Sequence, residues 1–348
     1  MRVLEQQILQ KLPGALLPWY RENKRDLPWR QDREPYHIWL SEVMLQQTRV
    51  EAVKGYYARF LETLPDIPAL AECEDDLLYK LWEGLGYYSR ARNLKKAACV
   101  IMEQHGGIFP SGYADIRALP GIGDYTAGAI CSIAYDMPAP AVDGNVLRVI
   151  SRLTEDDTPI DQPVYKEKVR QALQEVYPKE AGDFTQALME LGATVCGPNR
   201  APDCESCPCR EFCLAKLRGT AQQLPVKLGK KPRREEDMTL FVVSCEGRYA
   251  LRKREDKGLL AGLWEFPHVP GQLEPEAALQ ALEKLGVRPR QLHRQTDKKH
   301  IFTHVQWNMR GFYLEAAEMA QPFIWLTADE IKESAALPTA FRQFWDDA

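Results

Sequence analysis

The sequence predicts a multidomain protein, with an all-α module followed by a smaller α+β domain. Apolar residues recur at three- and four-residue spacing from about 35 to 135 and from about 144 to 195, which is typical of helices. Beyond residue 238, short runs rich in β-branched and aromatic residues indicate strands instead. Five of the nine cysteines fall between Cys196 and Cys213, which predicts a ligand-holding segment at the end of the helical module.

We predict three segments along the chain. Residues 1–218 form the helical module, one part of which spans about 30–135, while the N-terminal helix and about 136–218 form the other. A linker covers 219–237, and the α+β domain covers 238–348. In this domain we expect strands at 239–244, 248–251, 301–307, 310–315 and 323–326, and helices at 276–285 and 338–345.

The bulk composition limits the class of protein. Hydrophobic residues make up 45% and charged residues 27% of the chain, so we expect a packed core. No apolar run approaches the roughly 18 residues of a membrane span, and the N-terminus lacks the apolar region of a signal peptide, so we expect a cytoplasmic protein. The net charge of −4 gives no bulk attraction to nucleic acid, and any DNA contact must come from clustered basic groups and backbone amides.

A helix is predicted from Pro35, a residue that suits the first turn because it lacks an amide hydrogen. One face of this helix comprises Tyr36, Trp39, Leu40, Val43 and Gln47. Glu42 stands beside that face, with Ile38, Trp39, Leu45 and Gln46 as its helical neighbours. A carboxyl group in apolar surroundings loses hydration when ionised, so we expect a raised pKa suited to proton donation. The alternative is a solvated glutamate on an amphipathic helix.

Two further motifs follow. Gly121 and Gly123 form a tight turn before a helix that starts near Asp124, and amides at such a helix start can hold a phosphate. The alternative is a turn in which the glycines serve geometry alone. Asp143 precedes another apolar helical pattern and is expected to be its N-cap. Glu42 and Asp143 would then form a carboxylate pair, one inclined to be protonated and the other held ionised.

The cysteine segment reads C-x7-C-x2-C-x5-C through Cys196, Cys204, Cys207 and Cys213, with Cys209 as an additional thiol. Four thiolates in so short a loop suit a tetrahedral zinc ion or an iron–sulfur cluster. The spacing alone does not separate the two.

Together these motifs resemble those of the helix-hairpin-helix DNA glycosylases that carry a [4Fe–4S] cluster, and within them the branch that removes adenine. The stretches 41–48, 84–88 and 142–146 are similar to sequences specific to that branch, and the resemblance covers nearly the whole chain. It implies a helix-hairpin-helix core with a six-helix barrel at about 30–135. The implied substrate is duplex DNA with adenine opposite 8-oxoguanine, and we expect a monomer.

The resemblance also implies roles for individual residues. Glu42 matches the catalytic acid and base, Asp143 matches the group that stabilises the transition state, and the four cysteines of the spacing match the cluster ligands. Bifunctional relatives carry a lysine where this chain has Tyr125, and a phenol cannot form an imine with the sugar, which implies a monofunctional enzyme. Positions matched to DNA or adenine binding are Arg30, Gln47, Thr48, Leu85, Tyr87, Gly121, Gly123 and Gln186.

The C-terminal segment resembles the Nudix-like domain of the same family, notably at 258–267. Hydrolases of that fold need a glutamate-rich helix for magnesium, and 276–285 offers only Glu276 and Glu283, so we expect no nucleotide hydrolysis. Phe302, Thr303 and His304 match the loop that recognises 8-oxoguanine, where the family commonly has Phe-Ser-His. The alternative is a strand in which Phe302 serves ordinary aromatic packing.

One departure and two alternative functions accompany this interpretation. The first cysteine spacing has seven intervening residues where the family has six, so Cys209 is a candidate to replace a neighbour as ligand. A related glycosylase acting on mismatched thymine or oxidised pyrimidines is the alternative enzyme. A non-catalytic iron–sulfur DNA-binding protein is the alternative from another class.

Overall fold

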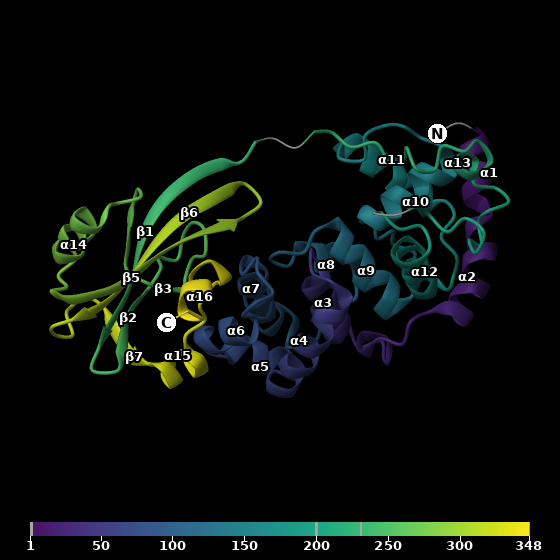
Figure 1. Ribbon diagram of the computed structural model, residues 1–348. Helices are drawn as coiled ribbons and strands as arrows, with labels where there is room; N and C mark the ends of the chain where they lie inside the picture. The colour runs from purple at the N-terminus through teal and green to yellow at the C-terminus, as the bar shows by residue number, and fades with distance from the viewer. Residues whose placement is uncertain (1–2, 199–200, 230–231, 348) are drawn as a thin grey trace. The chain divides into compact units, whose positions relative to one another are not determined.

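The computed structural model describes residues 3–198, 201–229 and 232–347, and the chain divides into two compact units (Figure 1). Residues 1–72 and 93–229 form the first unit, and residues 73–92 and 230–348 form the second. The segment 73–92, which lies inside the predicted helical module, therefore groups with the C-terminal domain. Within the described ranges, no helix is long and apolar enough to cross a membrane.

The first unit is helical. Its elements are α1 (Val3–Gln10), α2 (Leu12–Asn23), the 3-10 turn η1 (Pro28–Arg30), α3 (Pro35–Leu45), α4 (Val50–Thr63), α5 (Ile67–Glu72), α8 (Tyr113–Ala118), α9 (Asp124–Tyr135), α10 (Gly144–Thr154), α11 (Pro163–Gln174), α12 (Ala181–Thr194) and α13 (Leu214–Leu217). The boundary between the units falls within α7 (Ser89–His105).

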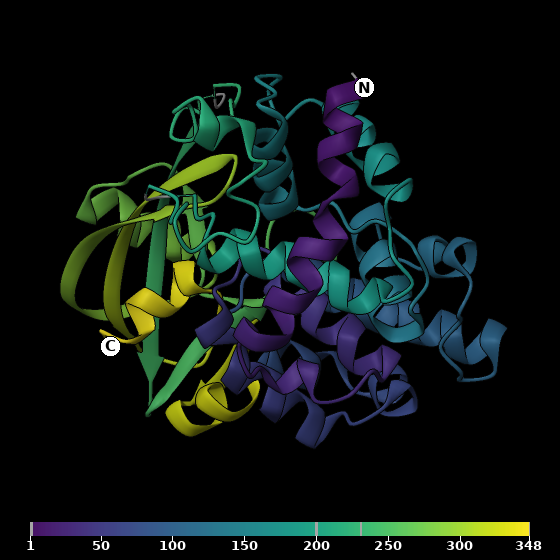
Figure 2. The same cartoon turned by 90° about the vertical axis from the view of Figure 1, so that its right-hand side faces the viewer.

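One apolar core joins α1 and α2 to α10, α11 and α12, although about 120 residues of chain separate the two groups. Figures 1 and 2 show the purple N-terminal helices lying against the teal helices of this group. The core includes the fully buried Leu9, Leu12, Leu16, Phe184 and Ala187. The N-terminal helix thus completes the same part of the unit as residues 136–218.

The paired helices α3 and α9 are buried on nearly every side, as expected of helices that are apolar all round. Trp39 of α3 packs edge-on against Phe109 at 5.4 Å, and Tyr36 donates a hydrogen bond to the carbonyl of Leu64 at 2.8 Å. A Cβ at Gly128 of α9 would lie 2.4 Å from the carbonyl oxygen of Pro140, so glycine permits this close approach. The start of α3 at Pro35 confirms the predicted helix start.

The second unit contains a seven-stranded sheet in its described residues, with strand order β3-β2-β1-β6-β5 and with β4 and β7 paired to β1 and β2. Among the strand pairs of the described residues, only β1–β6 is parallel. The elements are α6 (Asp75–Leu81), β1 (Arg234–Cys245), β2 (Arg248–Lys253), β3 (Trp264–Glu265), β4 (His268–Pro270), α14 (Pro275–Lys284), β5 (Pro289–Ile301), β6 (Val305–Ala316), β7 (Ile324–Thr327), α15 (Ala328–Ser334) and α16 (Thr339–Trp345).

Alternation along β1 gives the sheet two apolar faces. Leu240 and Val242 pack with Phe341 of α16 on one face, whereas Phe241 and Val243 pack with Leu282 of α14 on the other. In Figure 1, α14 and α16 accordingly lie on opposite sides of the central strands. The two predicted helices of this domain are confirmed as α14 and α16.

Three expectations about the strands and one about a helix are wrong. Residues 305–307 and 310–315 belong to one strand, β6, whereas 302–304 form the turn before it, and the long β5 that precedes this turn was missed. β5 lies at the edge of the sheet and is largely exposed, so its residues lack an apolar alternation. β1 begins at Arg234, inside the predicted linker. α3 ends at Leu45, so Gln47 is not on its face and adopts a φ of 59°.

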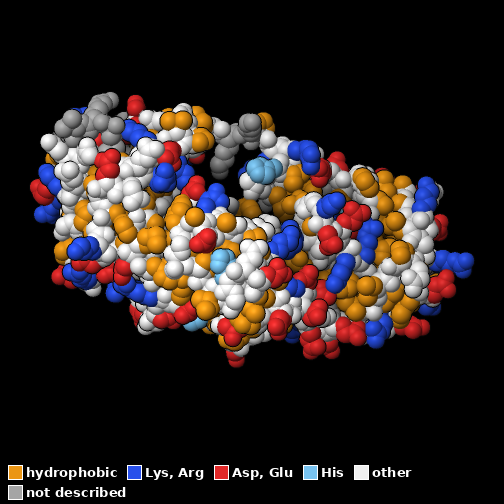
Figure 3. Space-filling view, turned by 180° about the vertical axis from the view of Figure 1, so that it is seen from behind, with side chains coloured by type: hydrophobic (Ala, Val, Ile, Leu, Met, Phe, Trp, Pro, Cys, Tyr) orange, Lys and Arg blue, Asp and Glu red, His pale blue; other side chains and the backbone are white. Residues whose placement is uncertain are grey.

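Charged side chains are distributed without large single-sign areas on the face that Figure 3 shows. Blue and red side chains alternate there with hydrophobic ones. This pattern agrees with a net charge of only −4 over 348 residues.

Candidate active site

A pocket of about 540 Å³ opens in the helical unit and gathers seven of the predicted site residues. Of the sequence-predicted residues, the pocket is lined by Arg30, Glu42, Gln47, Thr48, Tyr125, Asp143 and Gln186. They come from η1, α3, the turn after α3, α9, the loop before α10, and α12. Tertiary packing therefore brings together segments that are far apart in the sequence.

Glu42 is buried at the pocket wall, with only 6% of its surface exposed. The hydroxyl of Tyr125 donates a hydrogen bond to Oε2 of Glu42 at 2.5 Å. Burial raises the pKa of Glu42 to about 7, although the hydrogen bond from Tyr125 and the charge of Arg30 act to lower it. The expectation of a raised pKa is confirmed, and the solvated-glutamate alternative is excluded.

Tyr125 stays a hydrogen-bond donor in this site. Burial, together with the nearby Glu42 and Asp143, raises the pKa of Tyr125 well above its usual value. Its hydroxyl therefore remains protonated and directed at Glu42 across the α3–α9 contact. The sequence showed only that a tyrosine stands where bifunctional relatives have a lysine, and it did not predict this hydrogen bond.

Asp143 caps α10 as predicted, since its Oδ1 accepts a hydrogen bond from the amide of Val146 at 2.7 Å. Nδ2 of Asn145 donates to the other oxygen, Oδ2, also at 2.7 Å. Burial nevertheless raises the pKa of Asp143, while these hydrogen bonds and the charge of Arg148 oppose the shift. The sequence predicted the cap at Asp143, but it did not reveal that this carboxyl, like that of Glu42, is desolvated.

Arg148, which sequence reasoning missed, connects Asp143 to the cysteine segment. Its Nη2 donates to Oδ1 of Asn145 at 2.8 Å, and its Nε donates to the backbone carbonyl of Cys196 at 2.8 Å. A continuous series of hydrogen bonds therefore runs from Asp143 to Cys196. The sequence signal for Asn145 and Arg148 was their position alone, because both lie in the first turns of the helix that Asp143 caps.

Arg25 and Glu190 also line the pocket and were missed by the sequence reasoning. Glu190 lies four residues after Gln186 on α12, so both occupy the same helical face. Burial acts to raise the pKa of Glu190, but hydrogen bonds from Arg25 and Arg30 hold it below its usual value. Glu190 is consequently an ionised carboxylate inside the pocket.

The hairpin glycines lie between α8 and α9. Gly121 has a φ of 77°, and a Cβ there would lie 2.5 Å from Cβ of Asn93, so both conformation and space require glycine. Gly123 is the N-cap of α9 and, like Gly121, is exposed. The first amides of a helix such as α9 have no intrahelical acceptors.

Four cysteines, Cys196, Cys204, Cys207 and Cys213, line one small cavity, with Arg152 also at its wall. Nη1 of Arg152 donates to the sulfur of Cys196 at 3.1 Å. Among the described residues, no three His, Cys, Asp or Glu side chains converge as ligands of one metal ion.

Cys209 lies apart from that cavity wall. It is fully buried in the apolar core of the helical unit, and its hydrogen bond with Cys207 lowers the pKa of the Cys207 thiol. Part of the extended first spacing, 199–200, lies outside the described residues.

The remaining predicted residues lie in the second unit. Leu85 is buried, and Tyr87 is 47% exposed with a φ of 47°. Oη of Tyr87 lies 2.8 Å from Oγ1 of Thr303, and His304 is exposed. Phe302 packs between the rings of His300 and Trp307 at 4.5 and 4.8 Å. The aromatic packing considered for Phe302 is therefore present, although Phe302 and the exposed Thr303 lie in the turn between β5 and β6 and not in a strand.

Comparison with known proteins assigns a class to this fold and site. Residues 40–179 match the HhH-GPD superfamily of base excision DNA repair proteins, and residues 238–347 match the NUDIX domain. A solved thermostable thymine-DNA glycosylase aligns with a TM-score of 0.54 and 27% identity over 62% of this chain and 97% of its own. The protein is a base-excision DNA glycosylase with a C-terminal Nudix-like domain, as the sequence predicts.

Whole-chain relatives define the family. An adenine DNA glycosylase of Mus musculus is 38% identical over 95% of this chain and 77% of its own length. The Homo sapiens adenine DNA glycosylase is 36% identical over 95% of this chain and 72% of its own length. The chain belongs to the adenine DNA glycosylase family.

Proposed function

We propose that this protein removes adenine mispaired with 8-oxoguanine or guanine from duplex DNA, as a monofunctional glycosylase. The observation that carries the proposal is the presence of two carboxyls in one pocket, the buried Glu42 and the half-buried Asp143, with the pKa of Glu42 raised to about 7. A carboxyl with that pKa serves as acid and base near neutral pH. The pocket of about 540 Å³ has room for a base rotated out of the duplex.

In the proposed mechanism, protonated Glu42 delivers its proton to N7 of the adenine and makes the base a good leaving group. The C1′–N9 bond then breaks, its electron pair leaves with the base, and positive charge develops on the sugar. Ionised Asp143, held by Val146 and Asn145, stabilises that charge. Glu42, now ionised, takes a proton from the water that attacks C1′, and an abasic site results.

Backbone and side-chain groups around the pocket are proposed to hold the DNA. The exposed turn at Gly121 and Gly123 offers amides to a phosphate and fixes register without reading sequence. Gln47 and Thr48 line the pocket at the end of α3 and are proposed to fill the space left by the rotated base. Arg30 and Gln186 are proposed to contact the adenine.

We propose that residues 238–348, with Leu85 and Tyr87 of the same unit, read the base opposite the adenine. 8-Oxoguanine differs from guanine by a hydrogen on N7 and an oxygen on C8. A hydroxyl that accepts from N7–H distinguishes the two, and Thr303 carries an exposed hydroxyl. Within the described residues α14 carries only Glu276 and Glu283, which disfavours magnesium-dependent nucleotide hydrolysis.

The four cysteines that line one cavity are proposed to hold a [4Fe–4S] cluster. Their thiols come from a loop of 18 residues, and the buried guanidinium of Arg152 suits the negative charge of such a group. When bound, the cluster would brace this loop beside α10. Because one chain supplies the whole pocket, we propose a monomer that works in the cytoplasm, where thiols stay reduced.

The test uses the purified protein and duplexes that each contain one defined mispair. We expect release of free adenine from adenine opposite 8-oxoguanine, and strand breakage only after alkali treatment. Excision of thymine instead of adenine would contradict the proposal. Strand breakage without alkali would contradict the monofunctional assignment to Tyr125.

A further inference from the structure

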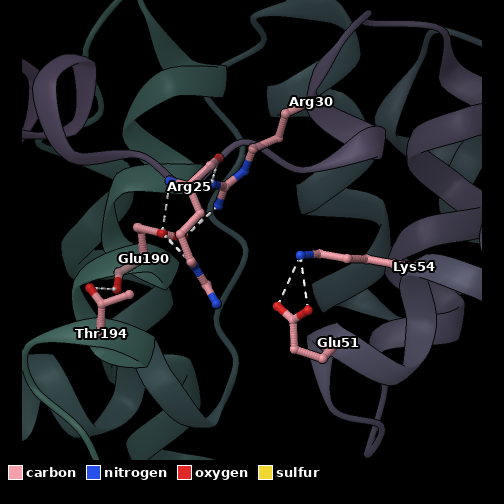
Figure 4. A network of polar contacts seen from close by, with 6 residues as sticks. All are labelled: Arg25, Arg30, Glu51, Lys54, Glu190 and Thr194. Atoms are coloured by element: carbon pink, nitrogen blue, oxygen red, sulfur yellow. Dashed lines mark hydrogen bonds and ion pairs between the residues drawn. The ribbon is translucent and has the colours of Figure 1, made fainter.

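Glu190 ties two arginines to one wall of the pocket (Figure 4). Its Oε1 accepts from the backbone amide and Nε of Arg25 at 3.2 and 2.6 Å. Its Oε2 accepts from Nη2 of Arg25 at 2.9 Å and Nη2 of Arg30 at 2.7 Å. Nη1 of Arg30 also donates to the carbonyl of Arg25 at 3.0 Å. Both oxygens of the carboxylate are therefore occupied by donors.

This cluster has a net charge of +1, since two guanidinium groups share one carboxylate. The side chain of Glu190 is only 1% exposed and that of Arg30 only 11%, so water screens their charges poorly. Arg25 is 37% exposed and forms the outer end of the cluster. Figure 4 shows the neighbouring Glu51 engaged with Lys54, at 3.0 Å.

The cluster faces the carboxyl group that the mechanism uses. Glu42 is faced by Tyr125 from α9, by Asp143 from the loop before α10, and by Arg30 from η1. Arg30 also lies over the ring of Tyr20, with its guanidinium carbon 5.5 Å from the centroid. The guanidinium of Arg30 is thus held by Glu190, by a backbone carbonyl and by an aromatic face.

We propose that Glu190 is a positioning residue for base removal: it fixes Arg30 at the pocket wall and keeps the charge of that wall at +1. The inference rests on the function proposed above. Because the guanidinium of Arg30 is already fixed, it presents donors to acceptor atoms on the edge of the base without losing side-chain entropy during the reaction. Because both oxygens of Glu190 already accept from Arg25 and Arg30, Glu190 acts on the base through Arg30.

Two substitutions separate this role from simple packing, because they change the charge of the wall in opposite directions. Glu190→Gln raises the charge to +2, which favours ionised Glu42 and lowers its pKa. Arg25→Gln reduces the charge to zero and raises the pKa of Glu42. Since Glu42 acts in its protonated form, the basic limb of the rate profile should move to lower pH in the first variant and to higher pH in the second.

The measurement is the single-turnover rate of adenine release between pH 5 and 9, with thermal unfolding of each variant as a check of folding. We expect limb displacements of about 0.5–1 pH unit and a rate about 10–100-fold lower for Glu190→Gln. Arg25→Gln leaves the buried Glu190–Arg30 pair intact, so it keeps the test open if Glu190→Gln unfolds. Arg21→Gln is the matched control, because Arg21 pairs with Glu180 at 3.7 Å on the exposed surface, and its limb should not move.

Opposite displacements of the two limbs support the inference. Limbs that stay fixed, or that move in the same direction, overturn it. The variant Glu42→Gln separates this failure from failure of the proposed function. If Glu42→Gln loses adenine release while the basic limbs of Glu190→Gln and Arg25→Gln do not move, only the role of Glu190 is overturned. If Glu42→Gln retains adenine release, the role of Glu190 and the proposed function are both overturned.

Discussion

The hydroxyl oxygen of Tyr125 lies 2.5 Å from Oε2 of Glu42, so a protonated phenol donates to the carboxyl whose pKa burial raises to about 7. Burial and this hydrogen bond act in opposite directions, because burial disfavours the ionised carboxylate and the donor favours it. The resulting pKa lies where the carboxyl can both donate and accept a proton near neutral pH.

Tyr125→Phe removes the donor and should raise the pKa of Glu42 further. Since protonated Glu42 is the active form, the basic limb of the adenine-release profile should move to higher pH. The pH dependence of the single-turnover rate measures this shift. A limb that moves to lower pH would show that Tyr125 does not stabilise the carboxylate.

Glu42→Gln should abolish acid catalysis, and the rate of adenine release should fall by roughly 10²–10⁴-fold while binding to the mispaired duplex is retained.

The same variant, Glu42→Gln, should be more stable than the parent at alkaline pH. The folded-state pKa of Glu42 exceeds the ordinary value, so its ionisation costs stability as pH rises from about 4.5 toward 7. The stability gain should reach roughly 3 kcal/mol above pH 7 and vanish near pH 4. Urea unfolding at pH 5 and pH 8 measures it, and equal stability differences at both values would contradict a raised pKa.

Gly192→Ala should disturb Asp143 indirectly. A Cβ at Gly192 would lie 2.6 Å from Cβ of Asn145, the residue that donates to Asp143. Overpacking of this kind costs about 1–3 kcal/mol, and adenine release should slow as Asn145 is displaced. Gly55→Ala on α4 is the control, because its Cβ meets only Arg59 at 3.8 Å and should be neutral or slightly stabilising. Equal behaviour of the two variants would contradict the close contact.

Cys204→Ser should abolish the visible absorption, at about 400 nm, of a bound iron–sulfur cluster. Cys209→Ala should retain that band, because Cys209 lies in the apolar core and not at the wall of the cavity. Absorption spectra and iron content of the purified proteins provide the measurement. Loss of the band in Cys209→Ala, with Cys204→Ser unaffected, would reverse the assignment of these ligands.

Thr303→Val removes the hydroxyl that Tyr87 contacts at 2.8 Å while preserving the size of the side chain. The preference for adenine opposite 8-oxoguanine over adenine opposite guanine should fall about 3–10-fold, the value of one hydrogen bond. Thr296→Val on β5, the strand that precedes the turn with Thr303, is the control and should keep the preference. An unchanged preference in Thr303→Val would remove the proposed role. This substitution is more specific than truncation at Arg234, which would also remove the domain that packs with residues 73–92.

Sequence alone predicted the features that depend on local chemistry. Pro35 starts α3, Asp143 caps α10, and glycines form the hairpin turn before α9. These follow from backbone preferences and hydrogen bonds within a few residues, which a local pattern records. The apolar neighbours of Glu42 were also within reach, since they lie one turn away on the same helix.

Only the tertiary structure decided how the charges of the site are shared. The burial that raises the pKa of Asp143, the hydrogen bond from Tyr125 to Glu42 and the hydrogen bonds of Glu190 with Arg25 and Arg30 depend on packing between segments far apart in the sequence. Burial and hydrogen bonding across such contacts depend on which segments pack together, and local spacing carries no record of that packing. The sequence therefore determined which acids and bases are present, whereas the three-dimensional packing determined their protonation and their partners.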